Sequence, residues 1–257
     1  MYSALLAIIY LAFISLGLPD TLLGSAWPQM HIELNASLSS AGIITMIISL
    51  GTVISSLLSD KLNIKLGTGK VTAISVLMTA VALLGFSLSH SFIILCVLAV
   101  PYGLGAGAVD AALNNYVALH YSSKHMSWLH CFWGVGASIG PYIIGTCMAH
   151  GLGWRGGYSV ISVIQFTLTA ALFITLPLWK KVENSENNVS NENNERTQEE
   201  PQERKAKSLS EVLHIKGVIY ILFAFFCYSA VEQTTTLWCA SYLVLNRSID
   251  SNTAAKF

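Results

Sequence analysis

Carboxylates inside apolar segments are the residues of this sequence that are best placed to do chemistry. Of the 14 acidic residues, three lie within such segments: Asp20, Asp110 and Glu232. An ionised carboxylate is costly in hydrocarbon, so acids there usually face a protein interior or a water-filled cavity and serve ion or substrate pathways. A carboxyl group in that setting can load and release a proton. We therefore predict Asp20 and Asp110 as proton-coupling residues, with an interhelical hydrogen-bonded clamp as the alternative for each.

Glycines accompany two of these acids at helical spacing. In the segment that begins near Phe92, offsets of 4, 3 and 4 place one set on a single helix face: Gly103, Gly107, Asp110 and Asn114. The first apolar segment repeats the arrangement with Gly17, Asp20 and Gly24. Glycine allows a neighbouring helix to approach closely. The pattern predicts two helix faces that pack tightly and together line one aqueous cleft.

Polar and aromatic side chains near the middle of the segments are candidates for substrate contact. A polar solute needs donors and acceptors, and aromatic faces can stack on its apolar surface. The candidates are Asn114, Asn115, His130, Trp133, Glu232, Gln233 and Trp238. Packing alone would explain Trp133 and Trp238, and His130 could serve as an interhelical donor.

The elements that carry these residues read as membrane-spanning helices. The chain has 257 residues, of which 53% are hydrophobic and only 11% are charged. A bilayer core about 30 Å thick needs roughly 20 apolar residues per helix. Seven segments qualify: 4–24, 37–58, 71–90, 92–119, 127–149, 158–178 and 217–245. We expect an all-α, polytopic helix bundle in the cell membrane.

The cations predict the orientation of the bundle, because Lys and Arg favour cytoplasmic loops. With the N-terminus inside, 11 of the 14 cations are cytoplasmic, many of them in the polar stretch 179–215. Aromatic residues also gather at membrane interfaces. We expect Trp27 and Trp154 in the outer interfacial belt, with Trp128 and Trp179 in the inner one.

Five quoted stretches carry a family resemblance. The loop "SDKLNIKLGTGK" resembles the Asp-basic…Gly…basic loop of the major facilitator superfamily, although its spacing is longer and a Ser precedes the Asp. The remaining stretches resemble the fucose-permease-like branch, whose members are sugar:proton symporters: "GLPDTLLGSAWP", "GAVDAALNNYVALHY", "WLHCFWGVGASIGP" and "VEQTTTLWCASYLV". The resemblance implies two six-helix halves that alternate access to a central site, and a sugar and protons as substrates.

The resemblance also divides the chain. We expect an N-terminal six-helix bundle over 1–178, a cytoplasmic polar linker over 179–215, and a seventh helix with the start of the second half over 216–257. Relative to a twelve-helix carrier the sequence reads as truncated after the seventh helix. An inactive fragment, or a chain that self-associates or takes its missing helices from a partner, is therefore one alternative.

A second alternative is a drug or metabolite efflux antiporter. The stretch "GVGASIGPYIIG" spaces Gly136, Gly140, Pro141 and Gly145 much as in the superfamily's antiporter signature, although helix packing alone would explain it. An enzyme is not expected, because no nucleophile–base pair or zinc spacing is present. We expect no cofactor, no metal and no nucleic-acid partner.

Overall fold

The computed structural model describes the backbone of residues 2–196 and 209–257 and the side chains of residues 4–179 and 211–257. All regular elements in these ranges are helical. They are α1 (Tyr2–Asp20), α2 (Leu22–Glu33), α3 (Ser40–Leu66), α4 (Thr68–Leu88), α5 (Phe92–His120), α6 (Ser123–Ala149), α7 (Gly153–Arg196), α8 (Leu209–Leu213), α9 (Val218–Arg247) and α10 (Ser251–Ala254).

Seven of these helical segments are long and apolar enough to cross a membrane within the described chain. The first span, Ala4–Glu33, is formed by α1 and α2 together, and α3, α4, α5, α6, the Gly153–Trp179 part of α7, and α9 supply the others. The predicted seven spans and the all-α fold are confirmed.

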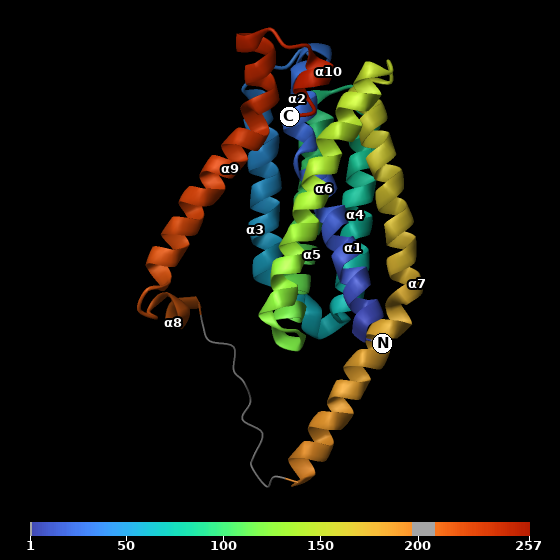
Figure 1. The fold of residues 1–257 in the computed structure, drawn as a ribbon, viewed down its shortest axis with the longest axis vertical. Coiled ribbons are helices and arrows are strands. Elements are labelled where there is room, and N and C mark those ends of the chain that lie inside the picture. Colours follow the sequence, from blue (N-terminus) through green and yellow to red (C-terminus); the bar gives the residue numbers. More distant parts are fainter. Residues whose placement is uncertain (1, 197–208) are drawn as a thin grey trace.

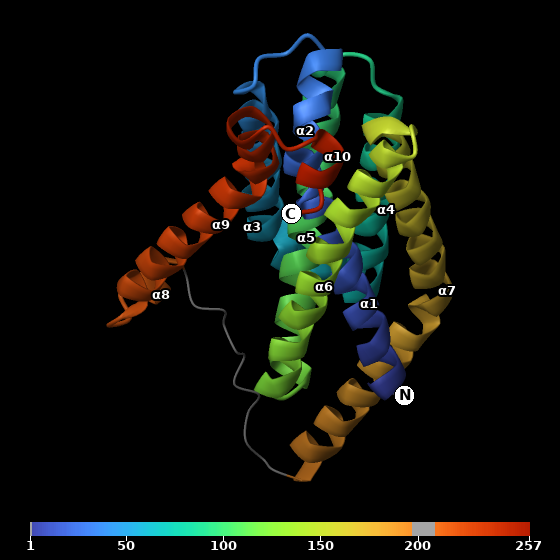
Figure 2. The same cartoon turned by 45° about the horizontal axis from the view of Figure 1, so that its top comes forward.

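Helices α1 to α7 form one bundle, and α9 leans away from it (Figure 1). Within the bundle α3 packs on α5, α4 packs on both α5 and α7, and α1 packs on α6. The contacts of α9 with the bundle run through α2 and α10, near the C-terminal end of α9 (Figure 2). One wall of the bundle is therefore covered by α9 only in part.

The predicted close approach of helices at glycine is confirmed for α5. A methyl group on Gly103 would lie 2.9 Å from the Ile48 Cα of α3, and one on Gly107 would lie 2.6 Å from the Thr52 Cα. A methyl group on Gly17 would likewise meet the α6 backbone, 2.9 Å from the Ala137 nitrogen. The glycine faces thus set the spacing of the helices that carry Asp20 and Asp110.

The N-terminus and the far end of α7 lie at one end of the bundle, and the C-terminus lies toward the other end (Figure 1). Helix α7 continues beyond the membrane span to Arg196, into the segment expected to be a polar linker. Residues 197–208 of that segment lie outside the described residues. The three-part division of the chain stays a prediction.

The end of the bundle opposite the N-terminus is closed by a polar network. Arg155 pairs with Glu33 and donates two hydrogen bonds to the Ser89 carbonyl, while its guanidinium lies over the Trp154 ring. The Trp154 indole donates to Glu33 at 2.9 Å. These contacts tie α2 and α7 to the end of α4.

The tryptophans do not form the expected interfacial belts. Trp27, Trp154 and Trp179 are buried within the bundle, and only Trp128 among the four is exposed. Their rings fill gaps between helices: the Trp179 ring lies on Gly69, and the Trp27 indole donates to the Leu38 carbonyl. The sequence could not tell a lipid-facing ring from an inward-facing one.

Candidate functional site

The first membrane span is interrupted at Asp20. Helix α1 ends there, Thr21 forms a turn, and α2 begins at Leu22. Pro19 explains the interruption, because proline has no N–H to donate and its ring clashes with the carbonyl four residues earlier. The break places the Asp20 carboxylate at the end of a helix in the middle of the bundle.

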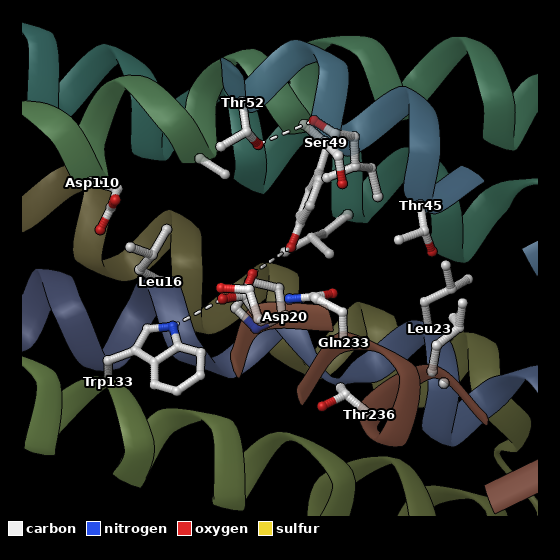
Figure 3. A pocket seen from close by; sticks show the side chains of 18 of the residues that line it. Leu16, Asp20, Leu23, Thr45, Ser49, Thr52, Asp110, Trp133, Gln233 and Thr236 are labelled. Carbon is white, nitrogen blue, oxygen red and sulfur yellow. Dashed lines mark hydrogen bonds between the residues drawn. The ribbon is translucent and has the colours of Figure 1, made fainter. Parts of the chain in front are cut away.

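Two donors from different helices hold this carboxylate. The Trp133 indole Nε1 of α6 donates to Asp20 Oδ2 at 2.9 Å, and the Tyr102 hydroxyl of α5 donates to Oδ1 at 3.5 Å (Figure 3). The side chain of Asp20 is nevertheless exposed to the cavity described next. It is thus oriented by the protein and open to a solute or water.

A cavity of about 600 Å³ lies in front of Asp20. Side chains of α1 to α7 and of α9 line it. Asp110 lines the same cavity, which confirms that the two acid-bearing faces share one cleft. Hydroxyl and amide groups of α3 and α9 add donors and acceptors: Thr45, Ser49, Thr52, Ser229, Gln233 and Thr236.

Asp20 lies within electrostatic range of the two other intramembrane acids. Asp20 interacts with both Asp110 and Glu232, and Asp110 interacts with His130. The hydrogen bond that Asp110 accepts, at 2.9 Å, comes from the Asn114 amide of its own helix. No group of three or more His, Cys, Asp and Glu in the described residues is arranged to hold a metal ion.

The predicted substrate contacts divide into two groups. Trp133 and Gln233 line the main cavity, and Glu232 lines a neighbouring cavity of about 480 Å³ that shares Trp133 and Thr236 with the first. The structure places the other four outside both cavities: Asn114, Asn115, His130 and Trp238.

These four residues have other surroundings. Asn114 donates to Asp110, and Asn115 is exposed. His130 lies edge-on to the Phe13 ring, with 6.1 Å between ring centroids. Trp238 packs against the buried core, as its packing alternative proposed.

Sequence reasoning missed Tyr102 and the polar stripe of α3. Thr45, Ser49 and Thr52 recur at offsets of 4 and 3, so the period used for the glycine faces would have found them. Tyr102 directly precedes Gly103 in the predicted span, and a phenolic hydroxyl inside a membrane helix usually seeks a partner. Neither the spacing on α3 nor the position of Tyr102 in the sequence predicts that the tyrosine binds Asp20.

Comparison with known proteins agrees with the fold and the cavity. Residues 9–254 match the Major Facilitator Superfamily. The chain belongs to this superfamily. It is therefore an integral membrane protein of a transporter family and not a member of an enzyme family.

Two curated relatives are similar to parts of the chain. The "Hexuronate transporter" of Bacillus subtilis (strain 168) is 22% identical over 244 residues, which are 94% of this chain and 56% of the relative. The "Uncharacterized transporter y4wD" of Sinorhizobium fredii (strain NBRC 101917 / NGR234) is 25% identical over 116 residues, 44% of this chain and 31% of the relative. The chain thus spans little more than half the length of the first relative.

Proposed function

We propose that this protein takes up a small polar solute of the sugar class, coupled to protons, by alternating access across the cell membrane. The observation that carries the proposal is Asp20: a carboxylate at a helix break, oriented by Trp133 and Tyr102 and open to a cavity of about 600 Å³. Ligand cavities typically measure about 300–1,000 Å³. The cavity is therefore of a size that holds a small solute.

The lining of the cavity supports a sugar. Hydroxyl and amide groups of α3 and α9 offer hydrogen bonds to sugar hydroxyls, and the partly exposed Trp133 ring offers an apolar face. The Bacillus relative named as a hexuronate transporter supports the same class.

The charges of the cavity favour a neutral sugar over a sugar acid. Its lining contains Asp20 and Asp110, and within the described residues no Lys, Arg or His lines it. An anionic carboxylate would meet two acids and no cation, and like charges at close range repel. We therefore propose a neutral hexose or pentose as the preferred substrate.

The coupling step follows from the position of Asp20. When the cavity opens to the proton-rich side, the carboxyl loads a proton, and the neutral loaded site can reorient through the low-dielectric bundle at lower cost. When the cavity opens to the other side, the proton and the sugar leave. The N-terminus and the α7–α8 connection lie on the cytoplasmic side in this proposal.

Uptake into membrane vesicles that carry the whole protein tests the proposal. An inward proton gradient should drive accumulation of a labelled neutral sugar above its external concentration, and hexuronate should accumulate less. Asp20→Asn should abolish accumulation but retain sugar exchange, because the amide mimics the protonated carboxyl and cannot release a proton. Asp250→Asn, outside the spans, is the matched control and should accumulate normally.

Each other outcome has a clear meaning. Full accumulation by Asp20→Asn would exclude Asp20 as the coupling residue and direct the same test to Asp110. Gradient-driven extrusion of the solute would instead favour the antiporter alternative. The glycines that suggested antiport have a packing role, since Gly136 and Gly140 lie against the α1 backbone.

A further inference from the structure

Pro19 leaves one backbone carbonyl of α1 without its helical donor. In an α-helix the carbonyl of residue 15 accepts from the N–H of residue 19, which proline lacks. Ser15 is only 3% exposed, and an unpaired carbonyl in the apolar interior of a membrane bundle is costly. An adjoining cavity of about 10 Å³ is barely large enough for one water molecule. Another protein group must satisfy this carbonyl.

The side chain of Gln165 on α7 supplies the missing donor. Its Nε2 donates to the Ser15 carbonyl at 2.5 Å, and its Oε1 accepts from the Ser15 hydroxyl at 2.5 Å. Gln165 is 1% exposed, and both the oxygen and the nitrogen of its buried amide bind Ser15, a residue 150 positions earlier in the chain. A reciprocal pair of hydrogen bonds satisfies the buried polar groups and also fixes the position of α1 relative to α7.

The pair lies directly upstream of the helix break that presents Asp20. On the downstream side the break is held by α6: the Thr21 hydroxyl donates to the Ala137 carbonyl at 3.0 Å, and Trp133 binds Asp20 itself. The interruption is therefore anchored by α7 before Asp20 and by α6 after it. Gln165 does not line the cavity, and its hydrogen bonds are to α1.

We propose that Gln165 is a positioning residue for Asp20: by taking the place of the donor that Pro19 removes, it holds the kink that directs the carboxylate at Trp133 and the cavity. The importance of this role for transport rests on the proposed function of Asp20 as the proton site. The claim that Gln165 positions Asp20 does not rest on that function, because the position of Asp20 can be tested without measuring transport.

The first test measures how firmly Asp20 is held by its two donors, Trp133 and Tyr102. Gln165→Met keeps the length and volume of the side chain but removes both hydrogen bonds. We expect dicyclohexylcarbodiimide to modify Asp20 about five- to tenfold faster in this variant, the size expected from loss of a buried hydrogen-bonded contact. Mass spectrometry of the Asp20 peptide from the purified whole protein gives the rate.

Ser162→Ala is the matched control. Ser162 is also buried on α7 and also binds a carbonyl of a neighbouring helix, Ala80 of α4, at 3.1 Å. Its loss weakens the bundle without touching α1. The modification rate of Asp20 in this control should stay within about twofold of the native rate, as expected for a site with no shared partners. Equal rates in Gln165→Met and Ser162→Ala would overturn the proposal.

The second test asks whether the Ser15 carbonyl is what Gln165 serves. Adding Pro19→Ala to Gln165→Met restores an N–H that can bind Ser15, so thermal stability should recover toward the native value. The kink is then lost, so the fast modification of Asp20 should persist. A double variant no more stable than Gln165→Met would refute this role for Gln165.

Transport separates this proposal from the proposed function. If Asp20 couples protons, Gln165→Met should lower the accumulation ratio while leaving sugar exchange largely intact. If Asp20→Asn still accumulates sugar, the proposed function fails, and the modification rates alone then decide whether Gln165 positions Asp20.

Discussion

Gly136 on α6 offers a direct test of the α1–α6 contact that carries the site. A methyl group at this position would lie 2.9 Å from the Leu18 nitrogen and 3.0 Å from the Ile14 carbonyl carbon, and would also meet the Ile14 oxygen. All three atoms belong to the α1 backbone, which cannot rotate away as a side chain can. We therefore expect Gly136→Ala to force the two helices apart.

The size of the effect follows from these distances. Ordinary heavy-atom contacts lie at about 3.5–4.0 Å, so the helices must separate by roughly half an ångström or more at Gly136. Overpacking of this kind costs about 1–3 kcal/mol. The gain in helix propensity from replacing Gly by Ala, about 1 kcal/mol, acts in the opposite direction.

A matched glycine on the same helix removes the propensity contribution. Gly134 has no atom within 4 Å of an added methyl group, so Gly134→Ala gains the propensity without the overlap. The two variants should therefore differ in free energy of unfolding by about 1–3 kcal/mol, with Gly134→Ala the more stable. Reversible unfolding of the purified protein in mixed micelles measures both.

Function should follow stability in this pair. Trp133 is one turn before Gly136, so the same separation would lengthen its 2.9 Å bond to Asp20 by roughly half an ångström and weaken it. Gly136→Ala should then lose proton-driven accumulation, and Gly134→Ala should keep it. Equal stability of the two variants would refute the close contact and with it the assembly of the site by α1 and α6.

Three further predictions concern the ends of the bundle. Arg155→Lys should destabilise the protein by about 1–2 kcal/mol in thermal unfolding, because lysine cannot reproduce the paired donors and the stacking; unchanged stability would show that the network adds nothing. At Asp250 the hydrogen bonds from the side chain and amide of Thr253 lower the pKa of the carboxyl, which caps the N-terminus of α10. The stabilisation by this cap is therefore complete at pH values above the ordinary Asp pKa, near 3.9, and is lost as the pH falls through the lowered pKa. The protection of the α10 amides, taken as the intrinsic exchange rate at each pH divided by the observed rate, should fall on acidification in the native protein, persist in Asp250→Asn, and be low at every pH in Asp250→Ala; a pH-independent native protection would contradict the cap. In a background free of native cysteines, a cysteine at Ser37 should react with an impermeant thiol reagent from outside intact cells and one at Ser122 only after permeabilisation, and the reverse pattern would invert the proposed orientation.

The spans and the acid-bearing faces could be predicted because each depends on a single segment. Hydropathy over about 20 residues identifies a span without knowledge of its neighbours. The period of 3.6 places Gly103, Gly107 and Asp110 on one face in the same way. The structure agrees at both levels: the seven segments are helices, and Asp20 and Asp110 line one cavity.

The lining of the cavity was harder to predict because a hydroxyl in a membrane helix can satisfy itself. Thr45 and Thr52 of α3 donate to the Ala41 and Ile48 carbonyls of their own helix, at 3.1 and 3.0 Å. A lipid-facing threonine makes the same bond. Sequence spacing therefore shows a stripe but not the direction in which it points.

The sequence by itself determined how many helices cross the membrane, which of them carry acids, and where glycine permits close packing, since these are properties of composition and period along one helix. Only the tertiary structure decided what the acids meet. Pro19 removes a donor, but which group replaces it depends on α7 returning to α1 with Gln165 opposite Ser15. Likewise, Trp133 binds Asp20 because α6 packs on α1 at this register. Hydrogen bonds between residues more than a hundred positions apart depend on which helices are neighbours, and a periodic pattern within one helix contains no such information.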